Sequence, residues 1–170
     1  MKVLWLVSFR PMGKSKTNDS FQGIFVDSVK ALNCDVHFSL TQFDEANVNK
    51  FVKEKKIKSF YTNISKKKLP RGKKYSNKLM LEKALDQYIE KGKFDYLVFS
   101  TADIIVPNNL FKELNKINLK NFCGFIFPNT QIIKGELKNV FWPYFGIDLV
   151  IFKIDKKKAK EFRKMIKFYN

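Results

Sequence analysis

Histidine and cysteine are scarce in this chain, which has one histidine and two cysteines among its 170 residues. Catalytic sites of the Ser/His/Asp and Cys/His types, and most zinc sites, need these residues close together. His37 falls within a predicted strand, where a lone histidine is more often structural, and we assign it no role. Cys34 and Cys123 lie far apart in apolar surroundings, as reduced core residues of a cytosolic protein do. These shortages argue against catalysis by histidine or thiol groups.

The sequence also lacks a long hydrophobic run, since none approaches the roughly 20 residues needed to cross a bilayer. The N-terminal segment MKVLWLVSF has one lysine, a short apolar run and no small-residue cleavage site, so it predicts a strand rather than a signal peptide. The length suits one hydrophobic core, and we predict a single domain over residues 1–170. We expect a cytoplasmic protein without a transmembrane segment. Peripheral attachment to a membrane surface through the lysine-rich last helix is the alternative.

Acidic residues are few: 16 Asp and Glu stand against 33 Lys and Arg, a formal net charge of +17. A protein this basic favours polyanionic partners such as nucleic acid, anionic membranes or phosphorylated small molecules. The excess is nearly all lysine, spread over every segment, and Asn and Ile are also abundant, a usage typical of an AT-rich genome. The aromatic and basic interleaving of RNA-recognition motifs is absent. We therefore do not expect a nucleic-acid partner, although a basic nucleic-acid-binding α/β domain is the alternative from another functional class.

Strands and helices alternate along the predicted secondary structure. The expected strands cover residues 3–8, 35–40, 57–61, 94–106, 122–127 and 148–152. A short strand at 131–133 is expected to pair at the edge of 122–127. The expected helices cover residues 20–32, 45–55, 76–91, 108–117 and 155–168, and Asp19 or Ser20 is the expected cap of the first. This alternation predicts an α/β fold with a mostly parallel central sheet and helices on both faces.

One carboxylate stands out in the segment FDYLVFSTADIIVP, residues 94–107. The segment is apolar on successive positions, which predicts a central strand covered on both faces. Asp103 lies between two apolar clusters, where a carboxylate is costly to bury without a metal, a cation or several donors. Open α/β sheets bind their ligands at the carboxyl ends of strands. Asp103 is therefore the first candidate for chemistry, and capping of the next helix or pairing with a lysine is the alternative.

Gly13-Lys14-Ser15 follows the first predicted strand and invites comparison with a phosphate-binding loop. That motif needs the pattern G-x-x-x-x-G-K-[ST], with a helix that starts at the lysine. Here Ser8 takes the place of the first glycine, Pro11 removes a backbone donor, and helical signals begin only near Asp19. An NTPase or kinase, with Asp103 as its metal partner, is kept only as an alternative.

The stretch from residue 71 to residue 114 resembles the core of inverting, family 2-like glycosyltransferases of the GT-A fold. Those families have a basic or glycine-containing loop, then a helix that begins near an Asn, then a strand that ends in a DxD motif. Asn77 and Lys78 match the helix start, and Thr101 and Asp103 take the two acidic positions of DxD. The resemblance implies a GT-A-like, Rossmann-like three-layer domain that acts as a nucleotide-diphospho-sugar transferase.

The resemblance also implies a role for each matching residue. Asp103 would hold a Mg²⁺ or Mn²⁺ ion that neutralises the diphosphate of the leaving nucleotide, and Lys78 would assist. Thr101 replaces the first acid of DxD, so only Asp103 can act as a carboxylate ligand. Asp44, at the end of the second strand, would accept hydrogen bonds from the base or ribose, unless it caps the helix at Glu45. The expected donor site comprises Asp44, Asn77, Lys78, Thr101 and Asp103.

The downstream stretch PYFGIDLVIFKIDKKKAKEF is similar to the acceptor side of the same family. Asp148 is the candidate base for the acceptor hydroxyl, although family members usually carry this acid in a later acidic loop; the alternative is that it only begins a strand. The aromatic residues between 141 and 145 could stack on a sugar ring. The prediction is thus transfer of a sugar from a nucleotide-sugar donor to a glycan or other hydroxyl acceptor. A degenerate domain that binds nucleotide sugars without catalysis is the alternative nearest to it.

Overall fold

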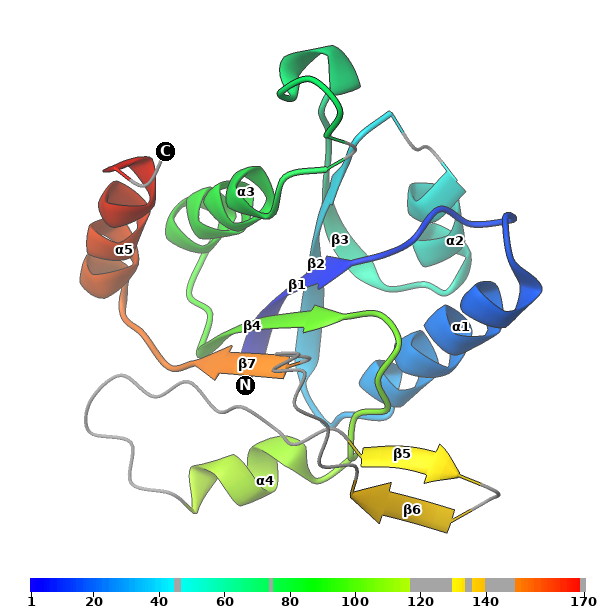
Figure 1. The fold of residues 1–170 in the computed structure, drawn as a ribbon. Helices are drawn as coiled ribbons and strands as arrows, with labels where there is room; N and C mark the ends of the chain where they lie inside the picture. The colour runs from blue at the N-terminus through cyan, green and yellow to red at the C-terminus, as the bar shows by residue number, and fades with distance from the viewer. Residues whose placement is uncertain (45–46, 74, 117–129, 134–135, 140–148, 169–170) are drawn as a thin grey trace.

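The computed structural model describes residues 1–44, 47–73, 75–116, 130–133, 136–139 and 149–168. Its centre is a five-stranded sheet in the order β3-β2-β1-β4-β7 (Figure 1). The strands are β1 (Lys2–Ser8), β2 (Asp35–Gln42), β3 (Lys58–Asn63), β4 (Tyr96–Thr101) and β7 (Leu149–Phe152). β1 to β4 run parallel, and β7 pairs antiparallel with β4. The predicted mostly parallel α/β sheet is confirmed.

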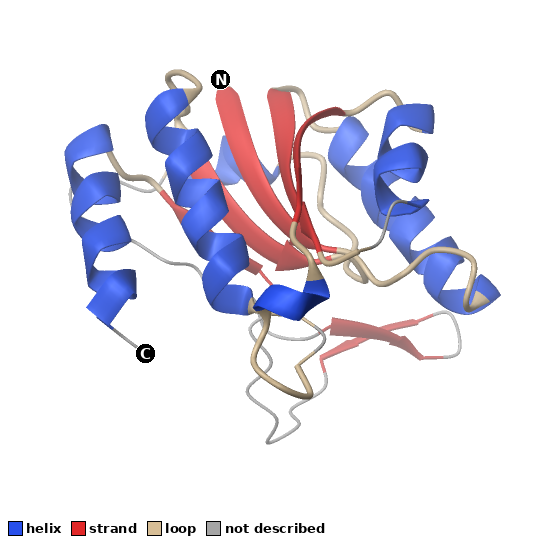
Figure 2. Ribbon diagram, turned by 90° about the horizontal axis from the view of Figure 1, so that it is seen from above, coloured by secondary structure: helices blue, strands red, loops and turns tan. Residues whose placement is uncertain are grey.

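Helices cover both faces of the sheet, as Figure 2 shows. One face carries α1 (Lys16–Lys30), α2 (Asn47–Glu54) and α4 (Leu110–Asn115), and the other carries α3 (Asn77–Glu90) and α5 (Lys156–Phe168). A 3₁₀ helix, η1 (Lys66–Lys68), follows β3, while β5 (Thr130–Ile133) and β6 (Glu136–Asn139) form a separate antiparallel hairpin. The three layers agree with the prediction. Within the described ranges, no helix is long and apolar enough to span a bilayer.

β1 is apolar on both faces because it lies at the centre of the sheet. Val3, Trp5 and Val7 pack into the core cluster on the α1 and α2 side, whereas its even-numbered leucines pack into the cluster on the α3 side. Trp5 is fully buried, and its indole Nε1 donates a hydrogen bond to Ser100 Oγ of β4 at 2.8 Å. This bond ties the middle of β1 to the carboxyl end of β4.

The last helix is bound to the domain along its inner face. Ala159 is buried, and Phe162 and Ile166 are half-buried in the same core cluster as α3. Arg163 Nε donates to Asp86 Oδ1 of α3 at 2.7 Å, and its Nη1 lies 3.4 Å from Glu82 Oε1. The apolar face of α5 is therefore packed against the sheet and α3.

α1 begins at Lys16, earlier than the predicted start at Ser20. Ser15 caps the helix, since its Oγ accepts a hydrogen bond from Asn18 N at 3.4 Å, while Asp19 accepts one from Gly13 N at 2.9 Å. The helix start thus comes closer to the phosphate-binding-loop pattern than predicted. However, the Gly13 N–H donates to the Asp19 carboxylate of the chain itself, whereas a phosphate-binding loop directs such N–H groups at the phosphate.

β4 ends at Thr101 and does not continue to Val106 as predicted. Its pairing with β1 ends at Ser8–Thr101, and its pairing with β7 ends at Ser100, so the residues beyond have no ladder partner among the described residues. The predicted strand at 122–127 lies outside the described residues. Residues 131–133 pair with β6.

The order of the strands reverses at β1. The chain passes from β1 to β2 and β3 on one side of the sheet, and the connection through α3 then brings β4 to the other side of β1. Such a reversal point, at the carboxyl ends of the two strands, is where open α/β sheets bind ligands. The residues that follow Ser8 and Thr101 are therefore candidates for a functional site.

Candidate functional site

Arg10 and Asp103 face each other at the carboxyl ends of β1 and β4. Ser8 and Thr101 are ladder partners in parallel strands, so the residues two positions further along emerge side by side. Arg10 Nη2 lies 3.5 Å from Asp103 Oδ2, and the two side chains are 63% and 45% exposed. Asp103 is thus not the buried carboxylate that the apolar run suggested, because β4 ends before it. An ion pair this exposed contributes no more than about 1 kcal/mol to stability.

The Arg10 side chain is held by α1. Its Nη1 donates to Asn18 Oδ1 at 3.2 Å, and its backbone N donates to Gln22 Oε1 at 2.6 Å. Gln22 is itself buried, and its Nε2 lies 3.0 Å from Met12 Sδ, so it holds the loop on both sides of Pro11. Arg10 is therefore oriented toward Asp103 by the helix that follows β1.

Sequence reasoning missed Arg10 because the ladder register between β1 and β4 was needed to find it. A signal was present, however: the chain has three arginines among its 33 basic residues. One of them, Arg163, makes a close charge-paired contact inside the domain. Because lysine fills almost every basic position, the few arginines indicate sites where the planar, forked guanidinium group is needed and a lysine ammonium could not replace it.

The residues around Asp103 do not fit the divalent cation that the sequence resemblance implies. Thr101 stands at the other acidic position of the motif, and its Oγ1 is buried without a hydrogen-bond partner among the described residues. A second cation at the Asp103 carboxylate would lie within a few Å of the Arg10 guanidinium and be repelled by it. Across the described ranges, no group of three or more His, Cys, Asp or Glu side chains could hold a metal.

A pocket of about 300 Å³ adjoins this pair on the β2 side of β1. It is formed by the loops that follow β1 and β2, together with the start of η1, and Pro11 joins its wall to Arg10 along the chain. Its lining residues are Pro11, Met12, Lys14, Asp44, Asn47, Val48 and Lys66. Asp103 and Arg10 lie outside this lining, so the site has two parts: a pocket and an exposed charged pair.

Asp44 forms part of the pocket wall, where the sequence had placed it as a ligand of the base or ribose. Its φ of 56° is in the left-handed region, which Asp tolerates better than most residues. Its backbone N donates to Asn63 Oδ1 at 2.9 Å, and its Oδ2 accepts from Lys66 N at 2.7 Å. The alternative that Asp44 caps a helix at Glu45 concerns residues 45 and 46, which lie outside the described residues; α2 is described from Asn47. Through these two bonds Asp44 holds the ends of β2 and β3 together.

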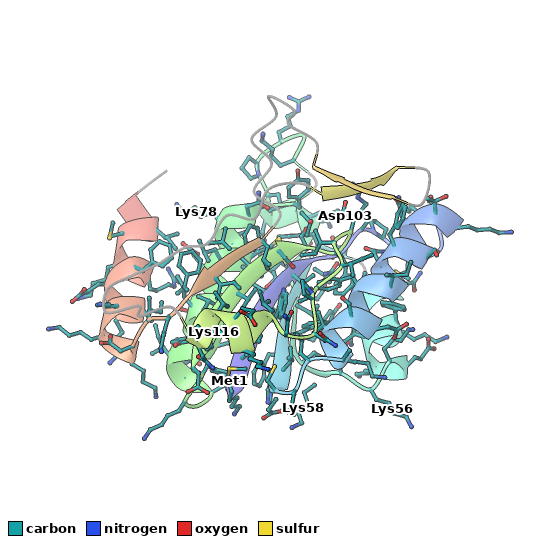
Figure 3. All side chains as sticks on the ribbon, turned by 90° about the horizontal axis from the view of Figure 1, so that it is seen from below. Met1, Lys56, Lys58, Lys78, Asp103 and Lys116 are labelled. Carbon is teal, nitrogen blue, oxygen red and sulfur yellow. The ribbon has the colours of Figure 1, made fainter. Side chains whose placement is uncertain are left out.

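Asn77 and Lys78 begin α3 as predicted, with Ser76 as the cap, whose Oγ accepts from Leu79 N at 3.3 Å. Figure 3 places Lys78 and Asp103 toward one edge of the molecule, and Met1 and Lys58 toward the opposite edge. The start of α3 is therefore on the side of the sheet where β1 and β4 end. Whether Asn77 and Lys78 contact a donor stays a prediction.

Asp148, the predicted base, lies outside the described residues, as do the aromatic residues between 141 and 145 and Cys123. β7 begins at the following residue, Leu149, and pairs there with Ser100 of β4.

The one histidine belongs to a cluster at the amino-terminal edge of the sheet, away from the site. His37 Nε2 lies 3.0 Å from Asp35 Oδ2, Lys58 Nζ donates to Asp35 Oδ1 at 2.7 Å, and the imidazole stacks on Phe60. The pKa of Asp35 is lowered to about 2, first by the hydrogen bond from Lys58 and to a lesser extent by the one from His37. His37 is structural, as expected of a lone histidine on a strand.

We expect Asp35→Asn to destabilise the protein at neutral pH but not in strong acid. A carboxylate with a depressed pKa stabilises the fold above its unfolded-state pKa of about 3.9, and that contribution is lost as the pH falls toward 2. Since the side chain is 42% exposed, solvent screens the interaction, and the loss at pH 7 should not exceed about 1 kcal/mol. Urea unfolding at several pH values checks this; a difference between variant and wild type that does not shrink between pH 4 and pH 2 would contradict it.

Comparison with known proteins adds a likeness in structure. No protein-family model matches the sequence, and no curated protein matches it. Among solved structures, the chain is similar to LgtC, a glycosyltransferase of the GT-A type, in the crystal structure of an active-site mutant. The match has 12% sequence identity and a TM-score of 0.46, and covers 96% of this chain and 59% of the LgtC chain. The chain thus spans about three fifths of the length of LgtC, and a likeness of this size establishes no shared active site.

Proposed function

We propose that the protein binds a nucleotide sugar at the carboxyl ends of β1 and β4 and transfers the sugar to a hydroxyl acceptor. The observation that carries this proposal is the pocket of about 300 Å³ between the loops that follow β1 and β2, whose wall residue Pro11 directly follows Arg10 of the charged pair at the reversal point of the sheet. Small-molecule sites measure about 300–1,000 Å³ and occur at such reversal points. The sequence resemblance of residues 71–114 to glycosyltransferases supports the same assignment.

The pocket lining suits a nucleoside. Met12 and Val48 offer apolar surface for a base, and Asp44 and Asn47 offer oxygen and amide groups for hydrogen bonds to the base or ribose. The diphosphate of a nucleotide seated there would extend past Pro11 to the charged pair at the strand ends. Asp103 can accept hydrogen bonds from hydroxyl groups of the transferred sugar, a part that a nucleoside diphosphate alone lacks, and Lys78, on the same edge, adds positive charge.

In the proposed reaction, the acceptor oxygen attacks the anomeric carbon of the bound sugar. The bond between that carbon and the diphosphate oxygen breaks, and the nucleoside diphosphate leaves with the electron pair. The acceptor proton passes to a base, for which Asp148 is still the predicted residue. Catalysis by this site requires stabilisation of the negative charge that develops on the leaving diphosphate.

Thermal unfolding with a panel of nucleoside diphosphates and nucleotide sugars tests the proposal. A ligand that binds the folded state at about 100 times its dissociation constant stabilises it by roughly 2.7 kcal/mol, an easily measured rise in Tm. We expect a rise for diphosphates of one base and for their sugar derivatives, and a smaller one for the matching nucleoside. Hydrolysis or transfer of the donor sugar in the presence of acceptor sugars would then identify the activity.

No rise in Tm with any nucleotide would overturn the proposal. If the same protein then bound DNA or RNA tightly, with an affinity that falls steeply as salt increases, the net charge of +17 would be the functional feature after all. Nucleotide-sugar binding without transfer to any acceptor would favour the non-catalytic alternative.

A further inference from the structure

The charged pair at the strand ends replaces the cation site that the sequence resemblance implies. Arg10 occupies the side of Asp103 that faces β1, with Nη2 3.5 Å from Oδ2. Thr101 Oγ1, at the other position of the motif, is buried and neutral, so it adds no charge that would attract a divalent ion. The only strong positive charge that the described structure places against Asp103 is therefore a guanidinium.

That guanidinium is both oriented and accessible. Nη1 donates to Asn18 Oδ1 at 3.2 Å, and the backbone N of Arg10 donates to the buried Gln22 side chain, so the residue is tied to α1 at two points. The side chain is nevertheless 63% exposed, which leaves N–H groups open to solvent. Guanidinium groups bind phosphate oxygens in a forked geometry that a lysine ammonium cannot reproduce.

Arg10 is also next to the pocket along the chain. Pro11, the next residue, and Met12 both line the pocket, so Arg10 directly precedes the part of the β1–α1 loop that a bound nucleoside would contact. The guanidinium lies against the Asp103 carboxylate. A diphosphate carries more negative charge than the Asp103 carboxylate, so its oxygens would compete with that carboxylate for the guanidinium.

We propose that Arg10 binds the diphosphate of the donor in place of a divalent metal ion, so that nucleotide binding by this protein is independent of Mg²⁺ and Mn²⁺. This inference rests on the proposed function and concerns the same site. Asp103 then has a positioning role, because it holds the guanidinium at the sheet edge, and it carries a negative charge that opposes the diphosphate. The metal-dependent and metal-free assignments therefore predict opposite effects when that charge is removed.

Calorimetric titration of the full chain with UDP, GDP, ADP, CDP and TDP tests the proposal, first in EDTA and then with Mn²⁺ or Mg²⁺. We expect the diphosphate that binds to have the same Kd in both buffers. Arg10→Gln should weaken binding roughly 10- to 100-fold, the value of a hydrogen bond between charged groups, and Arg10→Lys should restore part of it. Asp103→Asn should leave the Kd unchanged or lower it.

Lys30→Gln is the matched control, since it removes the same unit of charge from the last turn of α1. Lys30 lies roughly 18 Å along the helix from Asn18, beyond the Debye length of about 8 Å, so this variant should bind as the wild type does. Circular dichroism and Tm of each free variant confirm that it is folded.

Three results would overturn the inference. Binding that requires Mn²⁺ or Mg²⁺ and disappears in Asp103→Asn would restore the metal site while leaving the proposed function intact. Metal-free binding that Arg10→Gln does not weaken, or weakens no more than Lys30→Gln, would remove Arg10 from the site. Absence of binding in every buffer would defeat the proposed function itself, and this inference with it.

Discussion

Asn47→Trp is expected to abolish the stabilisation of this protein by nucleoside diphosphates, a loss of roughly 2.7 kcal/mol at a ligand concentration about 100 times the wild-type Kd. Asn47 is exposed at the start of α2 and lines the pocket between the loops that follow β1 and β2. An indole at this position would occupy space that the proposal assigns to the nucleoside. Because Asn47 is exposed, the substitution places no group in the hydrophobic core.

Lys50→Trp provides the control for that experiment. It places the same bulky side chain on the same helix, at a residue whose side chain is 80% exposed and does not line the pocket. We expect the nucleotide-dependent rise in Tm to persist in Lys50→Trp and to vanish in Asn47→Trp. If both variants kept it, the pocket would not be the nucleoside site; if both lost it, the effect would come from α2 as a whole.

Trp5→Ala is expected to lower the free energy of unfolding by about 3–5 kcal/mol. Trp5 is fully buried in β1, and its ring meets Phe25 of α1 edge to face with 6.0 Å between centroids. Its removal also leaves the buried Ser100 hydroxyl without the indole donor. Since domains of this kind have total stabilities of about 5–15 kcal/mol, the variant should be close to the limit of folding.

Urea unfolding checks this expectation, with a lower midpoint and an unchanged slope as the predicted result. Phe21→Ala is the matched control, because Phe21 is also a large aromatic residue but is 50% exposed on α1. We expect that control to change stability by about 0.5 kcal/mol or less. A loss below about 1 kcal/mol for Trp5→Ala would mean that the junction of β1 and β4 is not the core that the packing indicates.

Local patterns predicted the elements of this fold more successfully than their ends. The apolar runs of β1 and β4 and the periodicity of α3 are strong signals because burial on one or both faces dictates them. The start of α1 was placed too late, because Ser15, Asp19 and Ser20 are all plausible caps in sequence. In the structure Asp19 accepts a hydrogen bond from Gly13 N and does not cap the helix, and this contact exists only once the loop has folded.

Some residues of the candidate site could likewise be found from local sequence, and others only from the folded structure. Asp103 and Lys78 could be proposed from the sequence, since a motif of neighbouring residues marks each position. Arg10 could not, because 93 residues separate it from Asp103 and no local pattern connects them. Asp44 was proposed as a ligand of the nucleoside from its place after the second strand, and it lines the pocket, but its hydrogen bond to Lys66 N depends on the pairing of β2 with β3.

The sequence by itself determined the alternation of strands and helices, the parallel α/β architecture and the edge of the sheet at which chemistry is expected. These follow from the period of apolar residues, which each short segment carries on its own. Only the tertiary structure decided that β4 lies next to β1 with Ser8 opposite Thr101. That register brings a guanidinium to the carboxylate where the motif implied a metal, because contacts between distant strands depend on how whole elements pack and not on the residues beside them.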